Sequence, residues 1–118
     1  MARACLVSIM KILITISKNH VGPRFDLTNE VVIARVQNGQ IIGEPRIILL
    51  PGASPEEICS LVIKEDVSVV ICGGIEEVHY QYLMWKKVKV FDSIIGPYEQ
   101  ALKLVLLDKL EAGAILPG

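Results

Sequence analysis

The chain has 118 residues, of which 52% are hydrophobic and 21% are charged, and its formal net charge is -1. This is enough apolar material for one folded core, which excludes an intrinsically disordered chain, and the near-neutral charge provides no basic field for nucleic acid. No run of about 18 uncharged apolar residues is present, so we expect no transmembrane helix and no membrane partner.

The cysteine content favours a reducing compartment. The chain contains three cysteines, Cys5, Cys59 and Cys72. An odd, sparse set without paired spacing argues against a disulfide framework. Residues 1–9 are basic and then apolar, but the apolar run is too short for a signal peptide and Lys11 interrupts it. We therefore expect a cytoplasmic protein with a single domain at 10–116 and an N-terminal lead-in at 1–9.

The first half of the chain is typical of a sheet. It predicts three strands, at 11–17 (KILITIS), 31–37 (VVIARVQ) and 40–50 (QIIGEPRIILL). Asn38-Gly39 between the second and third strands is a strong signal for a type I′ hairpin turn. Because Pro45 cannot donate a ladder hydrogen bond, the third strand is expected at an edge of the sheet or at a bulge.

The second half alternates helices with short strands. Ser54 can cap a first helix, since Pro55 suits the first helical position and Glu57 completes a capping box. The other predicted elements are strands at 67–72 and 88–91, a helix from 76 to 87 and a helix from 98 to a cap at Gly113. The order β-β-β-α-β-α-β-α predicts an α/β domain whose sheet is antiparallel at the hairpin and parallel at the crossovers.

Ligands of open α/β sheets bind beyond the carboxyl ends of the parallel strands. Three segments should lie there: the loop with His20, Arg24, Phe25 and Asp26, the turn Cys72-Gly73-Gly74, and the loop Asp92–Gly96. Glycines allow a ligand to approach the backbone, a helix N-terminus attracts anions, and Arg24 adds a planar cation. The pattern favours a small anionic guest, although two glycines can also simply end a strand.

Two of these side chains could ligate a metal. Cys72 is a candidate soft ligand, with a small buried hydrophobe as the alternative. His20 could ligate, or it could be an exposed bystander. Asp26, Glu76 and Asp92 could form a carboxylate metal site like that of a two-metal nuclease, but a nuclease would need a basic surface and no enzyme motif is present. We therefore expect a binding protein and not an enzyme.

The second helix carries large side chains. Val78, Tyr82 and Trp85 share one face, which predicts core packing. Tyr80 and Met84 lie on another side and could form a surface for a partner or a homodimer. This leaves, as an alternative function, an interaction module without a cofactor.

Four segments together resemble a known family. They are KILITIS (11–17), VGPRFDLT (21–28), VSVVICGGIE (67–76) and VKVFDSIIGPYEQALK (88–103). Over residues 10–116 the chain resembles the dinitrogenase iron–molybdenum cofactor biosynthesis family, of the NifX type and of the C-terminal part of NifB. The resemblance implies a ribonuclease-H-like fold with a five-stranded mixed sheet, order 3-2-1-4-5, and three helices. It also implies a small carrier that binds molybdenum- or iron-containing sulfide clusters and exchanges them with donor and acceptor proteins.

The chain departs from the family in its first loop. Family members commonly carry His-Phe-Gly-Arg there, where this chain has Arg24-Phe25-Asp26-Leu27. Arginine is not a soft-metal ligand, but it can pair with an anionic cluster through charge-assisted hydrogen bonds, and His20 could replace the histidine as a metal contact. A carboxylate at Glu76, after the two glycines, would repel an anion. Taken together with the three loops at the strand ends, the resemblance implies a cluster site at Arg24, Phe25, Asp26, Cys72, Gly73 and Gly74.

Overall fold

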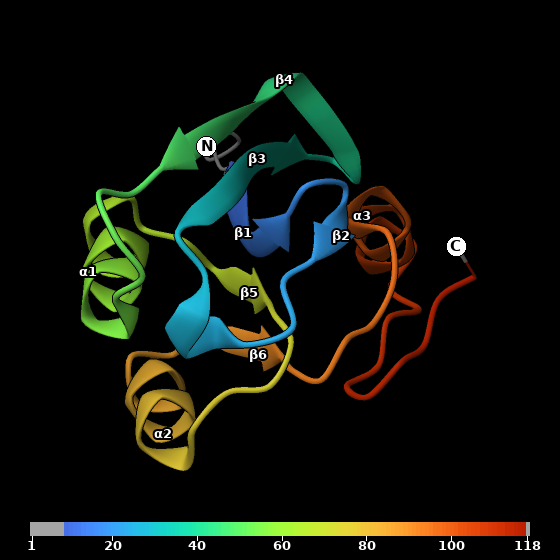
Figure 1. The fold of residues 1–118 in the computed structure, drawn as a ribbon. Coiled ribbons are helices and arrows are strands. Elements are labelled where there is room, and N and C mark those ends of the chain that lie inside the picture. Colours follow the sequence, from blue (N-terminus) through green and yellow to red (C-terminus); the bar gives the residue numbers. More distant parts are fainter. Residues whose placement is uncertain (1–8, 118) are drawn as a thin grey trace.

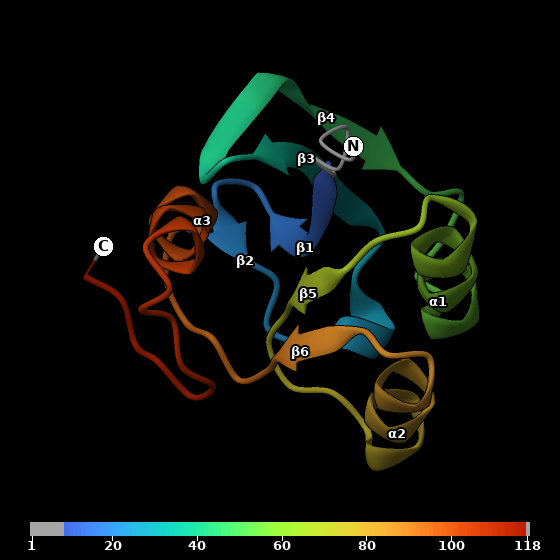
Figure 2. The ribbon, with the colours of Figure 1, turned by 180° about the vertical axis from the view of Figure 1, so that it is seen from behind.

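The computed structural model describes residues 9–117, so Cys5 and, apart from Ile9, the expected lead-in at 1–9 lie outside the described residues. A mixed sheet forms the middle layer of the domain (Figure 1). Helices α1 and α2 cover one face of the sheet and α3 covers the other, as the view from behind in Figure 2 also shows. Within residues 9–117, no helix has the length and apolar character that crossing a membrane requires.

The strands and helices alternate along the second half of the chain, as predicted. The strands are β1 (Met10–Ser17), β2 (His20–Val21), β3 (Glu30–Gln37), β4 (Gln40–Leu49), β5 (Val69–Ile71) and β6 (Lys89–Phe91). The helices are α1 (Pro55–Lys64), α2 (Glu77–Trp85) and α3 (Tyr98–Leu106), with a short 3-10 helix η2 at Phe25–Leu27.

The sheet follows the order β4-β3-β1-β5-β6, and β2 pairs with β1 outside this path. β1 is antiparallel to β3, and β3 to β4, whereas β1, β5 and β6 are mutually parallel. The α/β class, the mixed sheet and the three helices are confirmed. The strand count of five is wrong, because the first loop contributes the two-residue strand β2, which shifts the numbering of all later strands. The ribonuclease-H-like assignment stays a prediction.

Local signals placed the hairpin and the edge strand correctly. Asn38 and Gly39 both have positive φ, at 55° and 76°, as a type I′ turn requires. β4 is an edge strand of the sheet, and its register with β3 shifts near Gly43 and Pro45. The missing N–H of the proline and the positive φ of the glycine account for the irregularity at this place.

The start of α1 follows the predicted capping, but the end of α3 differs from the prediction. The Ser54 hydroxyl accepts a hydrogen bond from the Glu57 N–H (3.2 Å), which confirms the cap of α1. α3 ends at Leu106 and not near Gly113, because Asp108 adopts a positive φ of 59° and the Lys109 N–H turns back to the Leu104 carbonyl (2.8 Å). The remaining segment packs against the sheet without forming a helix.

Alternation along β1 creates two cores. Ile12, Ile14 and Ile16 point to the α3 face. Leu13 points to the face under α1 and α2, where it joins a cluster that includes Val70 and Leu83. Because both faces of β1 are apolar, this strand lies in the middle of the sheet and brings its carboxyl end next to those of β5 and β6.

Candidate functional site

The carboxyl ends of β1, β5 and β6, with the loops that follow them, form what we call the strand-tip edge. Backbone hydrogen bonds join the three loops. Gly74 accepts from the Phe25 N–H (2.8 Å), and Gly73 accepts from the Ser93 N–H (2.8 Å). The Val21 N–H donates to the Gly96 carbonyl (2.9 Å). The expectation that the three strand tips adjoin is therefore confirmed.

Between the first loop and the end of β5, the chain's own backbone fills the space where a hollow was expected. A Cβ on Gly73 would lie 2.3 Å from the Gly22 carbonyl oxygen and 2.5 Å from that of Pro23. Gly73 is therefore a packing glycine, which lets the first loop lie directly on the end of β5. The Gly74 N–H donates to the Pro23 carbonyl (2.8 Å), so the expectation that both glycines present free amides to a ligand is wrong.

Phe25 belongs to the core. Its side chain is fully buried in the cluster under α1 and α2, and its ring centroid lies 5.9 Å from that of His79. The residue occurs in η2, which turns the loop inward after Arg24. Phe25 anchors the first loop to the domain, and the structure gives it no surface on which it could contact a cofactor.

Cys72 is fully buried at the end of β5. Burial, with a smaller contribution from the nearby Asp92 carboxylate, raises the pKa of its thiol from about 9 to about 12. Metals bind the thiolate form, which this environment disfavours. The geometry thus matches the alternative reading of Cys72 as a small buried hydrophobe.

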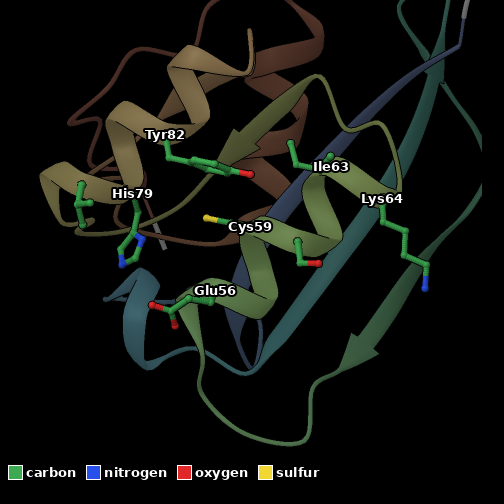
Figure 3. Close-up of a pocket in the computed structure, with 8 residues that line it drawn as sticks. Glu56, Cys59, Ile63, Lys64, His79 and Tyr82 are labelled. Atoms are coloured by element: carbon green, nitrogen blue, oxygen red, sulfur yellow. The ribbon is translucent and has the colours of Figure 1, made fainter.

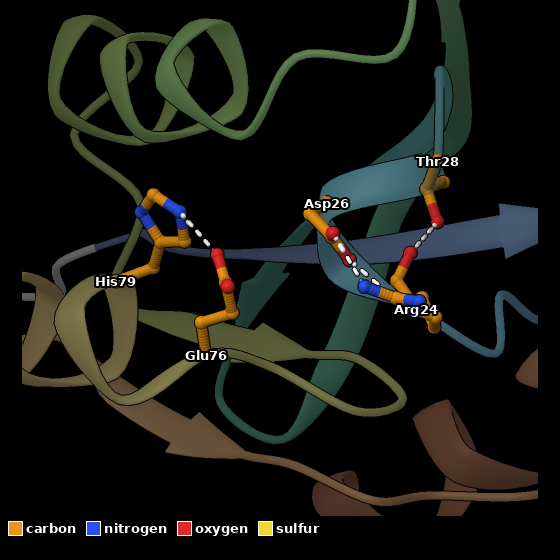
Figure 4. A network of polar contacts seen from close by, with 5 residues as sticks. All are labelled: Arg24, Asp26, Thr28, Glu76 and His79. Carbon is orange, nitrogen blue, oxygen red and sulfur yellow. Dashed lines mark hydrogen bonds and ion pairs between the residues drawn. The ribbon is translucent and has the colours of Figure 1, made fainter.

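Arg24 is exposed at the strand-tip edge, but an acid accompanies it. Its guanidinium makes two hydrogen bonds to the Asp26 carboxylate, from Nε to Oδ1 (3.1 Å) and from Nη2 to Oδ2 (2.7 Å), as Figure 4 shows. The Thr28 hydroxyl also donates to the Arg24 carbonyl, which holds the loop in place. Asp26 therefore orients Arg24 and offsets the charge that was expected to attract an anion.

The other polar residues of this edge are divided among separate contacts. His20 is exposed on β2, where its backbone bridges to Pro97. Glu76 lies 3.5 Å from His79 Nε2 (Figure 4), and Asp92 accepts a hydrogen bond from the Ser93 hydroxyl. In the described part of the chain, no group of three or more His, Cys, Asp or Glu side chains is arranged to hold a metal ion.

A second hollow, which we call the α1–α2 groove, lies between those two helices and has a volume of about 550 Å³. One wall is a continuous face of α1, and the other is part of α2 (Figure 3). The groove is lined by Glu56, Cys59, Ser60, Ile63, Lys64, Val78, His79 and Tyr82. The Cys59 thiol points into it, and burial together with the Glu56 carboxylate raises the pKa of that thiol to about 11.

Sequence reasoning missed this groove because it put the wrong face of α2 inside. Val78 and Trp85 were assigned to the core, but they are 67% and 71% exposed. Tyr80 was expected outside, yet it packs against the buried cluster, and Leu83 is the one fully buried residue of the helix. One signal was available: Lys86 directly follows Trp85, and the stem of a lysine can cover an exposed apolar side chain, as it does here with Nζ 4.6 Å from the centre of the Trp85 ring.

Solved structures share this fold at low sequence identity. The crystal structure of PH0822 matches with a TM-score of 0.78 and 14% identity, over 87% of this chain and 94% of that one. A candidate dinitrogenase (MJ0327) from Methanocaldococcus jannaschii matches with a TM-score of 0.71 and 20% identity, over 86% and 92%. A candidate NifB protein (TM1290) from Thermotoga, assigned to the DUF35 family, matches with a TM-score of 0.68 and 15% identity, over 92% and 97%.

Comparison with family models identifies the family, whereas comparison with individual curated proteins gives no match by sequence. The family model described as "Dinitrogenase iron-molybdenum cofactor" matches residues 10–107, which is most of the chain and includes the whole strand-tip edge. The name of this family indicates an association with the iron–molybdenum cofactor. The chain belongs to the dinitrogenase iron–molybdenum cofactor family.

Proposed function

We propose that this protein is a carrier in metal-cofactor assembly, which binds a molybdenum- or iron-containing sulfide cluster as cargo and passes it to another protein without catalysing a reaction. The observation that carries the proposal is the family match over residues 10–107. The similarity in fold to a candidate NifB protein and a candidate dinitrogenase supports the same setting. Donor and acceptor proteins are the partners that such a role requires.

The exposed side chains of the strand-tip edge are the best candidates for holding the cargo. Metal–sulfide clusters are anionic, and Arg24 offers a planar cation whose side chain is 57% exposed. His20 is exposed on the neighbouring strand β2 and offers an imidazole nitrogen. Cys72 does not fit a ligand role, because its thiol is buried and protonated.

Such a site would hold its cargo loosely. The buried glycine and the occupied amide of Gly74 leave few backbone donors, and Asp26 competes with any anion for the arginine. A loosely held cluster can be transferred, whereas a cluster enclosed by several thiolates would be retained. The geometry therefore supports transient carriage more than storage.

The test is binding of tetrathiomolybdate, a soluble molybdenum sulfide dianion, under anaerobic conditions. The protein would be brought to equilibrium with the dianion by dialysis, and the molybdenum on the two sides of the membrane would be measured by mass spectrometry. We expect the unaltered protein to retain molybdenum, Arg24→Ala to weaken binding about tenfold or more, and His20→Ala to weaken it less.

Two variants serve as controls. Cys72→Ala should bind as well as the unaltered protein, because the buried thiol is not a contact. Lys103→Ala removes an exposed cation from α3, on the other face of the sheet, and should also bind normally. The carrier proposal fails if the unaltered protein retains no molybdenum, and the proposed site fails if only Cys72→Ala loses it.

A further inference from the structure

The outward face of α2 is an apolar stripe that no other described part of the chain covers. Val78, Tyr82 and Trp85 follow one another at helical spacing and are 67%, 39% and 71% exposed. Ile63 of α1 lies across the groove and is 42% exposed. Val78, Tyr82 and Ile63 line one continuous hollow, and Trp85 extends it along α2. Contiguous apolar surface of this kind marks a contact site for another protein.

Charges divide this surface into two ends. α1 and α2 run in the same direction, because each connects the end of one strand to the start of a strand parallel to it. The N-terminal ends of the helices carry Glu56 and Glu77, and the C-terminal ends carry Lys64 and Lys86. In the described part of the chain these four residues form no ion pair, whereas the acid that caps α1, Glu65, is already paired with Lys11 and Arg46, and only the exposed Asp66 opposes the lysines.

At the basic end, Lys86 lies over Trp85, which is 71% exposed. Lys86 Nζ lies 4.6 Å from the centre of the Trp85 ring and 5.8 Å from that of Tyr82. The lysine stem thus covers part of the apolar stripe while its charge remains available to a partner. The surface has an acidic end, an apolar middle and a basic end.

We propose that a second copy of this chain docks on the α1–α2 groove, with its two helices antiparallel to those of the first. A two-fold axis through the groove would place the acidic end of each copy against the basic end of the other and bring the two apolar stripes together. The surface is therefore complementary to itself, which is what an isologous dimer requires. The net charge of -1 creates almost no repulsion between copies.

The size and composition of the groove fit this arrangement. Its volume of about 550 Å³ can accept large side chains from the partner copy. Tryptophan and tyrosine are the residue types that most often dominate the binding energy of interfaces. Trp85 is thus the expected anchor of the dimer, and Ile63 and Val78 are the expected floor.

The first experiment measures self-association of the full chain by analytical ultracentrifugation, with a reductant present to prevent disulfide dimers. Trp85 is the single tryptophan of the chain, so its fluorescence reports on this surface alone. We expect a monomer–dimer equilibrium and a blue shift of the emission over the same concentration range. A chain that remains monomeric up to millimolar concentration would overturn the proposal.

Point variants then locate the interface. Val78→Glu and Trp85→Ala should each weaken dimerisation about tenfold or more, and neither should alter the fold, because both side chains are exposed. Leu107→Glu is the matched control, since Leu107 is 57% exposed beyond the end of α3. A dimer that Leu107→Glu breaks, or that Val78→Glu leaves intact, would place the contact elsewhere and reject this surface.

Charge reversal tests the antiparallel orientation. One variant carries Lys64→Glu and Lys86→Glu, which makes both ends acidic, and the other carries Glu56→Lys and Glu77→Lys, which makes both ends basic. Each variant alone should be monomeric, whereas an equimolar mixture should form a heterodimer. If each variant still dimerises alone, or if the mixture stays monomeric, the proposed pairing of the ends is wrong.

Discussion

The strand-tip edge and the α1–α2 groove differ in the burial of their residues, and in both regions the burial is the opposite of what the sequence predicted for several residues. At the strand-tip edge, residues chosen for their chemistry are used for packing, since Phe25, Cys72 and Gly73 are all buried. At the groove, residues chosen for packing are exposed, as Val78 and Trp85 show. This domain thus carries an open apolar surface on α1 and α2, whereas at its strand ends the first loop packs on the end of β5 through hydrogen bonds.

The difference shows how much a residue's role depends on what lies opposite it. Glycine is required both where a ligand approaches the backbone and where another chain segment does, and only the fold distinguishes these cases. Periodicity likewise defines the faces of a helix without saying which one is inside. In α2, apolar side chains occur on more than one face. Packing against the sheet therefore determines which face is buried, and that face contains Leu83.

The largest effect is expected from Gly73, the first of the two neighbouring glycines. Gly73→Ala would place a Cβ within 2.6 Å of the backbone of Gly22 and Pro23. Because backbone atoms cannot move aside without unpacking the first loop, we expect the free energy of unfolding to fall by about 3 kcal/mol or more. Urea denaturation followed by circular dichroism measures this loss.

Gly74→Ala is the matched control for this experiment. Its Cβ would lie 3.6 Å from the Pro23 carbonyl oxygen, which is an ordinary contact, so we expect a change within about 1 kcal/mol. Equal and small effects of the two substitutions would mean that the first loop does not rest on Gly73. The strand-tip edge would then be open, and the contrast with the groove would disappear.

The next effect concerns pH. The Cys72 thiol has a pKa raised from about 9 to about 12, so the folded state holds its proton more tightly than the unfolded state does. The resulting stability is fully present below pH 9 and is lost as the pH rises from about 9 towards 12. The unaltered protein should lose up to about 1.4 kcal/mol per pH unit more than Cys72→Ala over this window. Identical pH profiles would show that the thiol is accessible at the strand-tip edge.

The parts of the fold that could be predicted are those that neighbouring residues determine. Asn38-Gly39 can form its turn, and Ser54 can cap its helix, without help from the rest of the chain. The paired tips of β1, β5 and β6 also follow from the order of the elements. These features explain why the location of the strand-tip edge was correct.

The parts that could not be predicted depend on contacts between distant segments. The pairing of β2 with β1 is a local hairpin, since Ser17 lies opposite His20, but the bridge from His20 to Pro97 joins segments that are far apart in the chain. The occupied amide of Gly74 depends on Pro23 in the same way. No local pattern reports such contacts, so the burial of Phe25, Cys72 and Gly73 could not be predicted, and the cluster site itself stays a prediction.

A smaller effect is expected from a substitution at Thr15. The backbone carbonyl of Thr15 accepts a hydrogen bond from the Gly22 N–H at the strand-tip edge. Its hydroxyl is fully buried and has no hydrogen-bond partner among residues 9–117. Thr15→Val keeps the shape and removes the unpaired group, so it should raise the free energy of unfolding by about 1 kcal/mol. Thermal or urea unfolding would show the gain, and a loss would mean that the hydroxyl is bonded in solution.

Asp26→Asn should cause the smallest change in stability. It is also the sharpest test of the strand-tip edge as a weak anion site. The Arg24–Asp26 pair is largely exposed, so its loss should alter the free energy of unfolding by no more than about 0.5 kcal/mol. The guanidinium would lose its competing carboxylate, and the affinity for tetrathiomolybdate should rise about fivefold. Asp108→Asn, which also removes one exposed carboxylate but lies beyond α3, controls for net charge. If both variants raise the affinity equally, the dianion responds to overall charge and not to Arg24, because only Asp26 contacts the arginine.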